Sequence, residues 1–377
     1  MKKFLHLADL HIGKKLGDYS LLEDQKFVLR QAVEVAKNEN CDGILIAGDI
    51  YDKANPGTEA MAVFDEFLTE LCNLHKPVYL ISGNHDAPGR ISYLGKFLAG
   101  NQIIVPEKFT GTLQAVSDPD DEIQIYLLPF ITPARVREFY KNPDEKLNSY
   151  QDAVKIILKH SEIPDHKINI LVAHQYITNG IKSEEEFSIG GLDNIDSSVF
   201  DQFDYVALGH LHRPQKCNRE TIRYAGSPLK YSLSEEHQKK SFTILEIQDK
   251  QHIRIETIPI RLPHDVRTVR GNFEELSAMP RTLDYVRIIL TDENPIPDAR
   301  AILRDRFPRM LQFRIENSKF TTDQIVTSSE RIEQKYPVDM FRMFYQMQNN
   351  SHDPSERQLE IVRSIFDELQ EEKNLIS

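Results

Sequence analysis

The sequence has few cysteines and no long hydrophobic run. Its three cysteines, Cys41, Cys72 and Cys217, lie far apart and form no C-x-x-C pair, which argues against a disulfide framework or a cysteine-ligated zinc site. No segment approaches the ~18 apolar residues that a membrane-spanning helix needs. The apolar N-terminal stretch is interrupted by a carboxylate and two imidazoles and is too short for a signal peptide. We therefore expect a cytoplasmic protein without a membrane segment.

Positively charged residues are outnumbered by negatively charged ones. The 377 residues include 46 Lys and Arg against 58 Asp and Glu, which gives a formal net charge of −12. This is the wrong sign for a protein that holds nucleic acid by a broad basic surface, because non-specific affinity for DNA comes mainly from neutralising its phosphates. A polyanionic substrate must then be held locally, by metal ions, by a few cations or with help from a partner. The length allows two or three domains and a large core.

The first half of the chain alternates between buried strands and helices. Short apolar runs predict strands at 3–8, 44–47, 78–81, 123–128, 168–173 and 205–208. Apolar side chains at helical spacing predict helices over 23–38, around 60–71 and over 149–160. This alternation is typical of βαβ units with parallel strands.

The next segments predict a second sheet and two further parts. We expect consecutive antiparallel strands in a second sheet at residues 222–225, 242–247 and 253–258. Two sheets with helices outside them make an α/β fold, a two-sheet αββα sandwich. The pattern changes near 259–264, so the predicted domains are the sandwich over 1–262, a small α+β domain over 263–318 and a helical segment over 319–377.

Polar side chains with metal-binding atoms follow five of the predicted strands. Asp49 comes directly after the strand at 44–47, and in open α/β sheets ligands collect at that carboxyl edge. Residues two apart on extended backbone project to one side, which groups the pairs in D-x-H and H-x-H. The full set at the strand ends is Asp9, His11, Asp49, Asn84, His85, His174, His210 and His212. Each alone has a plainer explanation as a cap, a turn residue or a surface histidine; together at one sheet edge they predict a metal site.

The chemistry of this set indicates a dinuclear centre. Nitrogen and oxygen donors without thiolates favour manganese, iron or zinc. This set has too many ligands for one ion that keeps an open position, so we expect two ions with Asp49 as the bridging carboxylate. Two such ions lower the pKa of a bound water and stabilise both the attacking and the leaving oxygen when a phosphoryl group is displaced. The predicted reaction is phosphoester hydrolysis.

In chain order the motifs D-x-H, G-D, G-N-H-D, a single histidine after a strand and G-H-x-H resemble the calcineurin-like metallophosphoesterases. The resemblance implies a two-sheet sandwich flanked by helices. It implies one ion held by Asp9, His11, Asp49 and His212, and another held by Asp49, Asn84, His174 and His210. It also implies that His85 is the acid that protonates the leaving oxygen, with Asp52 orienting that ring. A cap or turn role for Asp52 is the alternative.

Further stretches, such as L-A-D-L-H-I-G, G-H-L-H-R-P and Y-A-G-S-P, resemble the nuclease subunits that work with a coiled-coil ATPase in bacterial DNA repair. That resemblance covers residues 1 to about 260 and implies two Mn²⁺ ions, with Mg²⁺, Fe²⁺ or Zn²⁺ as alternatives. It implies exonuclease action on duplex ends, endonuclease action on single strands or hairpins, a DNA-binding capping domain and a homodimer within a heterotetramer. The candidate DNA-contacting cations are Lys14, Lys15, Lys53, Arg90 and Arg213.

The C-terminal segment carries apolar stripes that fit docking on the ATPase. These residues are Phe341, Phe344, Tyr345, Leu359, Val362 and Phe366. Packing on their own domain or on each other is the alternative. Two other functions also stay open: a phosphatase or small-molecule phosphodiesterase on the same core, and a scaffold that has lost its metals. The scaffold has no reason to keep so many polar donors together.

Overall fold

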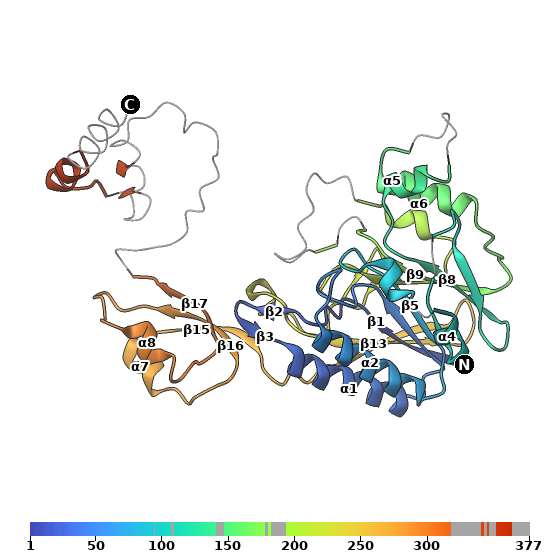
Figure 1. Ribbon diagram of the computed structural model, residues 1–377, viewed down its shortest axis with the longest axis horizontal. Coiled ribbons are helices and arrows are strands. Elements are labelled where there is room, and N and C mark those ends of the chain that lie inside the picture. The colour runs from blue at the N-terminus through green and yellow to red at the C-terminus, as the bar shows by residue number, and fades with distance from the viewer. Residues whose placement is uncertain are drawn as a thin grey trace. The chain divides into compact units, whose positions relative to one another are not determined.

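The computed structural model describes residues 1–93, 95–106, 109–140, 147–177, 180–181, 194–317, 341–342, 345–346 and 352–363. The chain divides into two compact units, Met1–Val266 and Arg267–Ser377. Figure 1 shows the strands and helices of each unit along the chain. None of the helices within the described ranges is long and apolar enough to cross a membrane.

The first unit is built on two six-stranded sheets. The first sheet has the order β14 (Ile253–Pro259), β13 (Ser241–Ile247), β1 (Lys2–Leu7), β4 (Gly43–Ala47), β5 (Val78–Ile81) and β6 (Ile103–Ile104). The second has the order β11 (Gln215–Cys217), β12 (Arg219–Tyr224), β10 (Tyr205–Gly209), β9 (Ile168–His174), β8 (Ile123–Leu128) and β7 (Gln114–Ser117). Apolar side chains of the two sheets meet in one buried cluster that includes Leu45, Ile125 and Val172.

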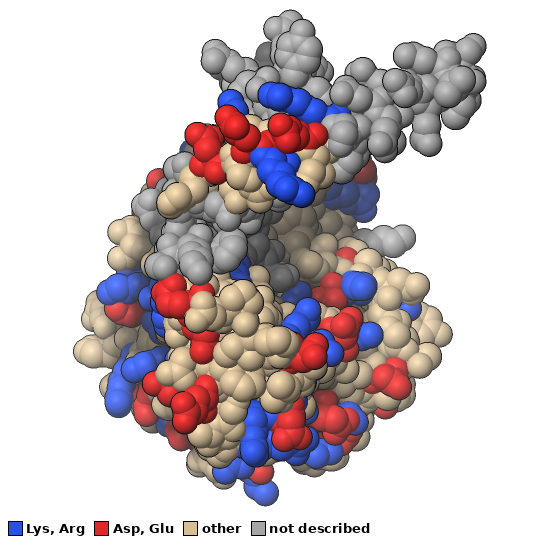
Figure 2. Space-filling model, turned by 90° about the vertical axis from the view of Figure 1, so that its left-hand side faces the viewer, with Lys and Arg blue, Asp and Glu red and all other residues tan. Residues whose placement is uncertain are grey.

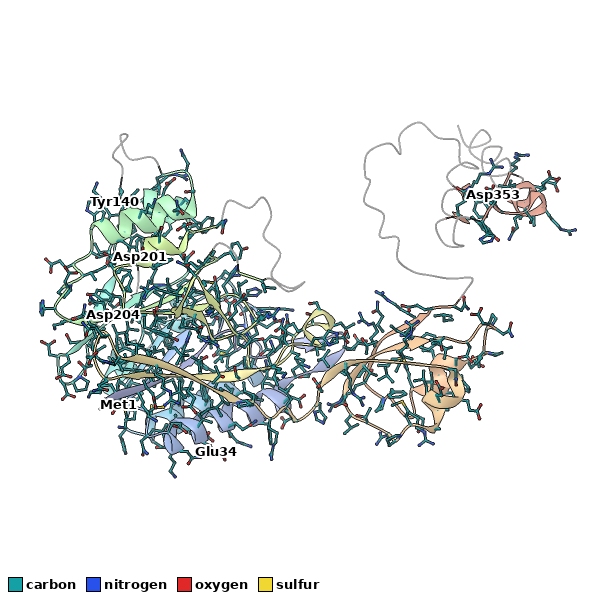
Figure 3. The ribbon with its side chains drawn as sticks, turned by 180° about the vertical axis from the view of Figure 1, so that it is seen from behind. Met1, Glu34, Tyr140, Asp201, Asp204 and Asp353 are labelled. Atoms are coloured by element: carbon teal, nitrogen blue, oxygen red, sulfur yellow. The ribbon has the colours of Figure 1, made fainter. Side chains whose placement is uncertain are left out.

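Helices cover the outer faces of this sandwich. The helices α1 (Leu22–Asn38) and α2 (Thr58–Cys72) pack against each other below the first sheet in Figure 1. Ala32 of α1 is buried, whereas Glu34 points outward at the lower edge of Figure 3. On the second sheet, Ile157 of α6 (Tyr150–Lys159) joins a cluster with Leu171 and Val206. The predicted αββα sandwich is therefore confirmed.

Short elements occupy the connections of the first unit. They are β2 (Lys15–Leu16), β3 (Tyr19–Ser20), α3 (Pro88–Ile91), α4 (Gly95–Gly100), α5 (Pro133–Arg137) and the 3-10 turns η2 (Ser197–Phe200) and η3 (Leu233–Glu235). In the first sheet, β1, β4, β5 and β6 run parallel to one another. In the second sheet, the parallel strands are β8, β9, β10 and β12. All five residues of β4 are buried, because parallel strands in the middle of a sandwich are covered on both faces.

The expectation that 222–225, 242–247 and 253–258 form one antiparallel group is wrong. β12 pairs parallel to β10 in the second sheet. β13 and β14 belong to the first sheet, where β13 pairs antiparallel to β1 and to β14. An alternating apolar pattern predicts which face of a strand is buried, but it does not say which sheet edge the strand completes.

The second unit begins with a small sheet of order β15 (Val266–Gly271), β16 (Tyr285–Leu290) and β17 (Met310–Ile315). The helices α7 (Phe273–Ala278) and α8 (Ala299–Leu303) supply Leu276 and Leu303 to a core with Ile288 of β16. A capping box between Asn272 and Glu275 lies at the start of α7. It satisfies backbone N–H groups that have no partner within the helix.

Parts of the C-terminal segment are described. The rings of Phe341 and Tyr345 have centroids 5.9 Å apart, and Gln358 donates to the Tyr345 hydroxyl at 3.5 Å. Leu359 is buried and Val362 is half-buried. Phe344 and Phe366 lie outside the described residues. These contacts fit local packing of the stripes, which was the alternative to docking.

Candidate metal centre

The candidate metal ligands follow strands of both sheets. Asp9, Asp49 and Asn84 come after β1, β4 and β5 of the first sheet, whereas His174 ends β9 and His210 follows β10 of the second. The expectation of one sheet edge is therefore corrected: the carboxyl ends of two facing sheets supply the donors. The sheets meet directly here, because Nδ1 of His174 lies 2.8 Å from the carbonyl oxygen of Ala47 in β4.

Two glycines allow this close approach. A Cβ atom at Gly209 would lie 1.9 Å from the carbonyl oxygen of Ala47. At Gly48, which has a φ of +84°, a Cβ would lie 2.5 Å from Nδ1 of His174. Any larger side chain would push the sheets apart, so glycine in G-D and G-H-x-H sets the distance across the site.

The backbone at the ligands is not extended, although the sequence spacing predicts extended chain. Asp9, His11 and Asp49 have φ values of 52°, 42° and 49°, which is the left-handed region that non-glycine residues rarely adopt. Backbone hydrogen bonds hold this conformation, from Asp9 N–H to the Gly48 carbonyl at 3.1 Å and from His11 N–H to the Asp49 carbonyl at 2.9 Å. Such local strain is common at functional sites.

One group of donors surrounds His174. Its Nε2 lies 3.3 Å from Oδ2 of Asp49 and 2.9 Å from Oδ1 of Asn84. The same Asn84 oxygen lies 3.1 Å from Nδ1 of the His210 ring. The backbone N–H of His210 donates to Oδ1 of Asp9 at 2.8 Å. Asp9, Asp49 and His174 together have donor atoms within 4.8 Å of one another.

A second group surrounds His11. Its Nε2 lies 3.5 Å from Oδ2 of Asp49 and 3.2 Å from Nε2 of His212. His11, Asp49 and His85 form another set with donor atoms within 4.8 Å. Asp49 thus stands between the groups, and one of its oxygens faces an imidazole of each. The structure brings together all seven residues that the sequence suggested as ligands.

Burial and charge shift the pKa values in this cluster strongly. Burial lowers the pKa of His174, but the nearby Asp49 carboxylate outweighs it and raises that pKa to about 9. Burial alone raises the pKa of Asp49, whereas His174 and His11 bring it well below the usual range. Burial raises the pKa of Asp9 and lowers that of His11. The site therefore stabilises a positive charge beside Asp49, either a proton or a cation.

A buried polar atom shows that the residues fit a metal ion. Oδ2 of Asp9 is buried and has no hydrogen-bond partner among the described residues, which is costly for a carboxylate oxygen. The facing Nε2 atoms of His11 and His212 cannot both carry a proton toward each other, so at least one lone pair points into the gap. Nitrogen and oxygen donors of this kind suit manganese, iron or zinc.

His85 is held beside this cluster by its backbone and its ring. Its N–H donates to Oδ1 of Asp49 at 2.9 Å, and its Nδ1 lies 3.0 Å from the carbonyl oxygen of Asp52. The Asp52 carboxylate instead lies 3.3 Å from Nζ of Lys14. The expectation that this carboxylate orients His85 is therefore corrected: the main-chain oxygen of Asp52 makes the contact.

The candidate DNA-contacting cations are arranged unequally around the site. Lys15 and Lys53 are exposed and line a hollow of about 750 Å³ together with Asp52 and the start of α2. Arg90 donates to Asn55, which lines the same hollow, at 3.1 Å. Arg213 is exposed outside that lining. On the face shown in Figure 2, blue and red side chains are interspersed, as the acidic composition predicts.

Several buried residues that support the site were not predicted. Asp86 accepts N–H groups of Ile50 at 3.1 Å, Tyr51 at 3.0 Å and Gly83 at 2.9 Å, and so joins the loops after β4 and β5. Gln25 of α1 donates to the His11 carbonyl at 2.7 Å. The G-N-H-D motif contained a signal for Asp86. Asp24-Gln25 in the first helix is part of the family resemblance, but the apolar spacing of that helix does not show that Gln25 is buried.

Glu235 is another buried support. Its carboxylate lies 3.0 Å from Nδ1 of His212 and 2.6 Å from Nζ of Lys240. Burial raises the pKa of Glu235, but the charge of Lys240 and the His212 hydrogen bond lower it to about 2. Both charges lie in residues 232–240, which are mostly polar, and charged residues are seldom fully buried unless they are paired.

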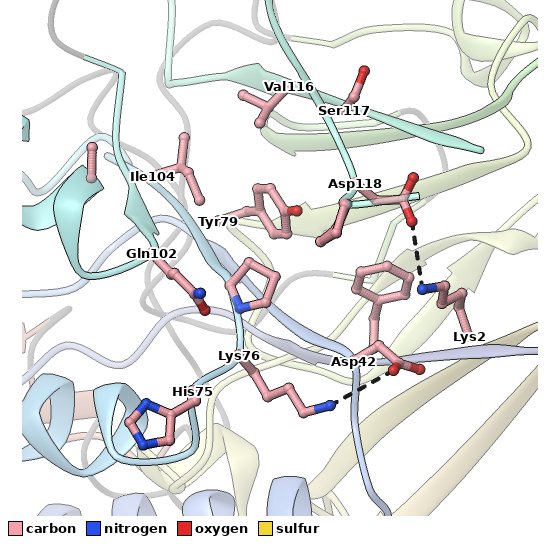
Figure 4. Close-up of a pocket in the computed structure, with 14 residues that line it drawn as sticks. Lys2, Asp42, His75, Lys76, Tyr79, Gln102, Ile104, Val116, Ser117 and Asp118 are labelled. Atoms are coloured by element: carbon pink, nitrogen blue, oxygen red, sulfur yellow. Dashed lines mark ion pairs between the residues drawn. The ribbon is translucent and has the colours of Figure 1, made fainter. Parts of the chain in front are cut away.

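Another hollow, of about 480 Å³, lies at the opposite end of the sandwich (Figure 4). Its lining includes Phe4 and Tyr79 near the starts of β1 and β5, and ion pairs join Lys2 to Asp118 at 3.7 Å and Lys76 to Asp42 at 3.8 Å. The ligand cluster follows the carboxyl ends of those strands, so this hollow is not part of the metal centre.

Comparison with known families agrees with this geometry. A family model described as calcineurin-like phosphoesterase matches residues 2–214. A second, described as type 5 capsule protein repressor C-terminal domain, matches residues 262–349. The fold and the site therefore define a metallophosphoesterase, a class whose members bind divalent metal ions.

Two relatives with curated descriptions identify the family within this class. The chain is 34% identical over 320 residues to the SbcD subunit of the SbcCD nuclease of Staphylococcus epidermidis, covering 82% of this chain and 84% of that protein. It is 32% identical over 330 residues to the SbcD subunit of Staphylococcus saprophyticus, covering 85% and 86%. The chain belongs to the SbcD family of SbcCD nuclease subunits.

Proposed function

We propose that this chain is a metal-dependent DNA nuclease whose site holds two Mn²⁺ ions. The observation that carries the proposal is the position of Asp49, since its Oδ2 lies 3.3 Å from His174 and 3.5 Å from His11. One ion would be held by Asp9, His11, Asp49 and His212. The other would be held by Asp49, Asn84, His174 and His210.

Bound at this site, two divalent ions supply Lewis-acid stabilisation of the phosphoryl group and a strong nucleophile at neutral pH. The protein supplies the remaining steps. His85, oriented through the Asp52 carbonyl at 3.0 Å, donates the proton that the leaving oxygen needs. Lys15 and Lys53, which line the adjoining hollow, bind backbone phosphates of the substrate, with Lys14, Arg90 and Arg213 around them.

We propose duplex ends as the exonuclease substrate and single strands or hairpins as the endonuclease substrate. The partner proposed is a coiled-coil ATPase, with a homodimer of this chain inside a heterotetramer. The names of the relatives, which are SbcD subunits of a nuclease, support a partner. The net charge of −12 supports it too, because most of the DNA backbone must then be held by metals and partner. The free cysteines Cys41, Cys72 and Cys217 suit a cytoplasmic location.

The test is a nuclease assay on linear duplex and hairpin DNA with Mn²⁺, with and without the co-purified ATPase. We expect degradation that requires Mn²⁺ and that is lost in Asp49→Asn, which removes the shared ligand. Cleavage of small phosphoesters without cleavage of DNA would refute the nuclease and favour a phosphatase or small-molecule phosphodiesterase. Fewer than one ion per chain after manganese loading would favour a scaffold.

A further inference from the structure

Glu235 and Lys240 form an ion pair with fully buried side chains. Nζ of Lys240 lies 2.6 Å from Oε2 of Glu235, and neither side chain has exposed surface. Taking two charges out of water costs more free energy than their attraction returns, unless further hydrogen bonds satisfy them. A buried pair of this kind is therefore weak evidence for stability, and its other contacts indicate what it does.

Lys240 attaches the loop after β10 to the start of β13. Its Nζ lies 2.8 Å from the backbone carbonyl oxygen of His212, 2.8 Å from Oγ of Ser227 and 2.8 Å from Oε1 of Gln238. The first of these contacts fixes the main chain of a candidate metal ligand. The remaining contacts satisfy the buried ammonium group.

Glu235 acts on the ring of the same histidine. Its Oε1 lies 3.0 Å from Nδ1 of His212. An ionised carboxylate can only accept hydrogen bonds, so the proton of the neutral ring must sit on Nδ1. The lone pair of His212 is then on Nε2, which lies 3.2 Å from Nε2 of His11 and faces the metal centre.

We propose that Glu235, held by Lys240, is a positioning residue that fixes the tautomer and the ring orientation of His212 for metal binding. This inference rests on the proposed ligand role of His212 and adds the group that prepares it. Metal-bound histidines commonly donate their second N–H to a carboxylate, and removing that partner typically weakens metal affinity by about 10- to 100-fold.

Two double variants separate the effect of the hydrogen-bond acceptor at position 235 from the effect of Lys240. Glu235→Gln with Lys240→Met keeps an oxygen that can accept from Nδ1, whereas Glu235→Leu with Lys240→Met does not. Both lose the Lys240 contacts, and both avoid a lone buried charge. The dissociation constant of Mn²⁺ is measured by counting free ions with electron paramagnetic resonance, and thermal unfolding of each chelated protein is followed in parallel.

We expect the Leu/Met variant to bind one Mn²⁺ about 10- to 100-fold more weakly than the Gln/Met variant, with similar unfolding temperatures. Equal Mn²⁺ affinities would overturn the positioning role and leave the pair a structural one. The tautomer in the wild-type chain gives an independent measurement. Long-range proton–nitrogen spectra of chelated, ¹⁵N-histidine-labelled protein should show His212 protonated on Nδ1, and protonation on Nε2 would overturn the proposal even if the Leu/Met variant fails to fold.

The variant His212→Ala separates this inference from the proposed function. Unchanged Mn²⁺ affinity in His212→Ala would refute the ligand assignment itself. A large loss in His212→Ala, combined with equal affinities of the two double variants, would refute the role of Glu235 alone.

Discussion

Nδ1 of His85 lies 3.0 Å from the main-chain oxygen of Asp52, while the Asp52 side chain turns to Lys14 at 3.3 Å. A neutral ring that donates from Nδ1 to a carbonyl presents Nε2 outward. In its protonated form the same ring presents an N–H to the substrate. The carbonyl fixes the ring without adding a charge, so it would orient His85 as the proposed acid without competing with substrate phosphate for it.

Replacing His85 should abolish catalysis and leave metal binding intact. We expect His85→Gln to lower the rate of DNA cleavage by about 10²- to 10⁴-fold, the usual contribution of a general acid. Its Mn²⁺ content should equal that of the wild type, because His85 is proposed as an acid and not as a ligand. Loss of a bound ion in this variant would instead make His85 a ligand, which its distance to His11 and Asp49 allows.

Asp52 should tolerate the loss of its charge. The variant Asp52→Asn keeps the main-chain oxygen that contacts His85 and weakens only the ion pair with Lys14. Since partly exposed ion pairs contribute about 0–1 kcal/mol, we expect DNA cleavage to fall by less than about tenfold. Single-turnover cleavage rates measure this. A loss as large as that of His85→Gln would show that the carboxylate itself takes part in proton transfer.

Manganese affinity should rise with pH. The Asp49 carboxylate raises the pKa of His174 to about 9, so without a cation this ring carries a proton at neutral pH. An ion that binds His174 must displace the proton, and this costs affinity below the pKa. We expect the Mn²⁺ affinity to increase by about tenfold per pH unit from pH 6 to 8 and to level off above 9. Calorimetry in buffers of different ionisation enthalpy measures the released protons; a pH-independent affinity would contradict the assignment.

His6 should make the fold sensitive to acid. It is fully buried, its Nδ1 lies 2.9 Å from the Tyr205 hydroxyl, and burial together with the Arg223 charge lowers its pKa to about 3. The unfolded chain takes up that proton near pH 6.5 and the folded chain does not. Stability from His6 is therefore present above about pH 6.5 and is lost progressively as the pH falls toward 3.

The variant His6→Leu removes this titration. When the pH is lowered from 7 to 5, we expect the free energy of unfolding to fall in both proteins. The fall should be about 1–2 kcal/mol smaller in His6→Leu than in the wild type. Denaturant unfolding of both chelated proteins at the two pH values measures the difference. Parallel losses in the two proteins would mean that His6 is protonated in the folded state or is not buried there.

The grouping of the candidate metal ligands could largely be predicted because each donor follows a buried apolar strand. Runs such as Ile44–Ala47 fix where a strand ends, and parallel strands bring their carboxyl ends together. The sequence could not show that Asp9 and Asp49 adopt left-handed backbone conformations, because these depend on hydrogen bonds between loops distant in the chain. The extended geometry expected for D-x-H was wrong for that reason, although both side chains reach the site.

Contacts between residues far apart in the chain limited what else could be predicted from the sequence. The apolar pattern of β13 predicts a strand but not that it completes the first sheet beside β1. Likewise, Glu235 and Lys240 resemble exposed charges in the sequence, and only the packing of the loop after β10 shows that they are buried. The role expected of the Asp52 carboxylate was mistaken because a sequence records side chains, whereas here a carbonyl oxygen makes the contact.

The meeting of two sheets at Gly209 and Ala47 also concerns the lifetime of the protein. In the proposed ligand sets donors from both layers would share the same ions, so each bound ion would cross-link the layers and add its binding free energy to the folded state, about 2.7 kcal/mol at a concentration 100 times the dissociation constant. A cell short of the metal would then hold less of this chain as well as a less active one, because layers without that cross-link would open more often to proteases.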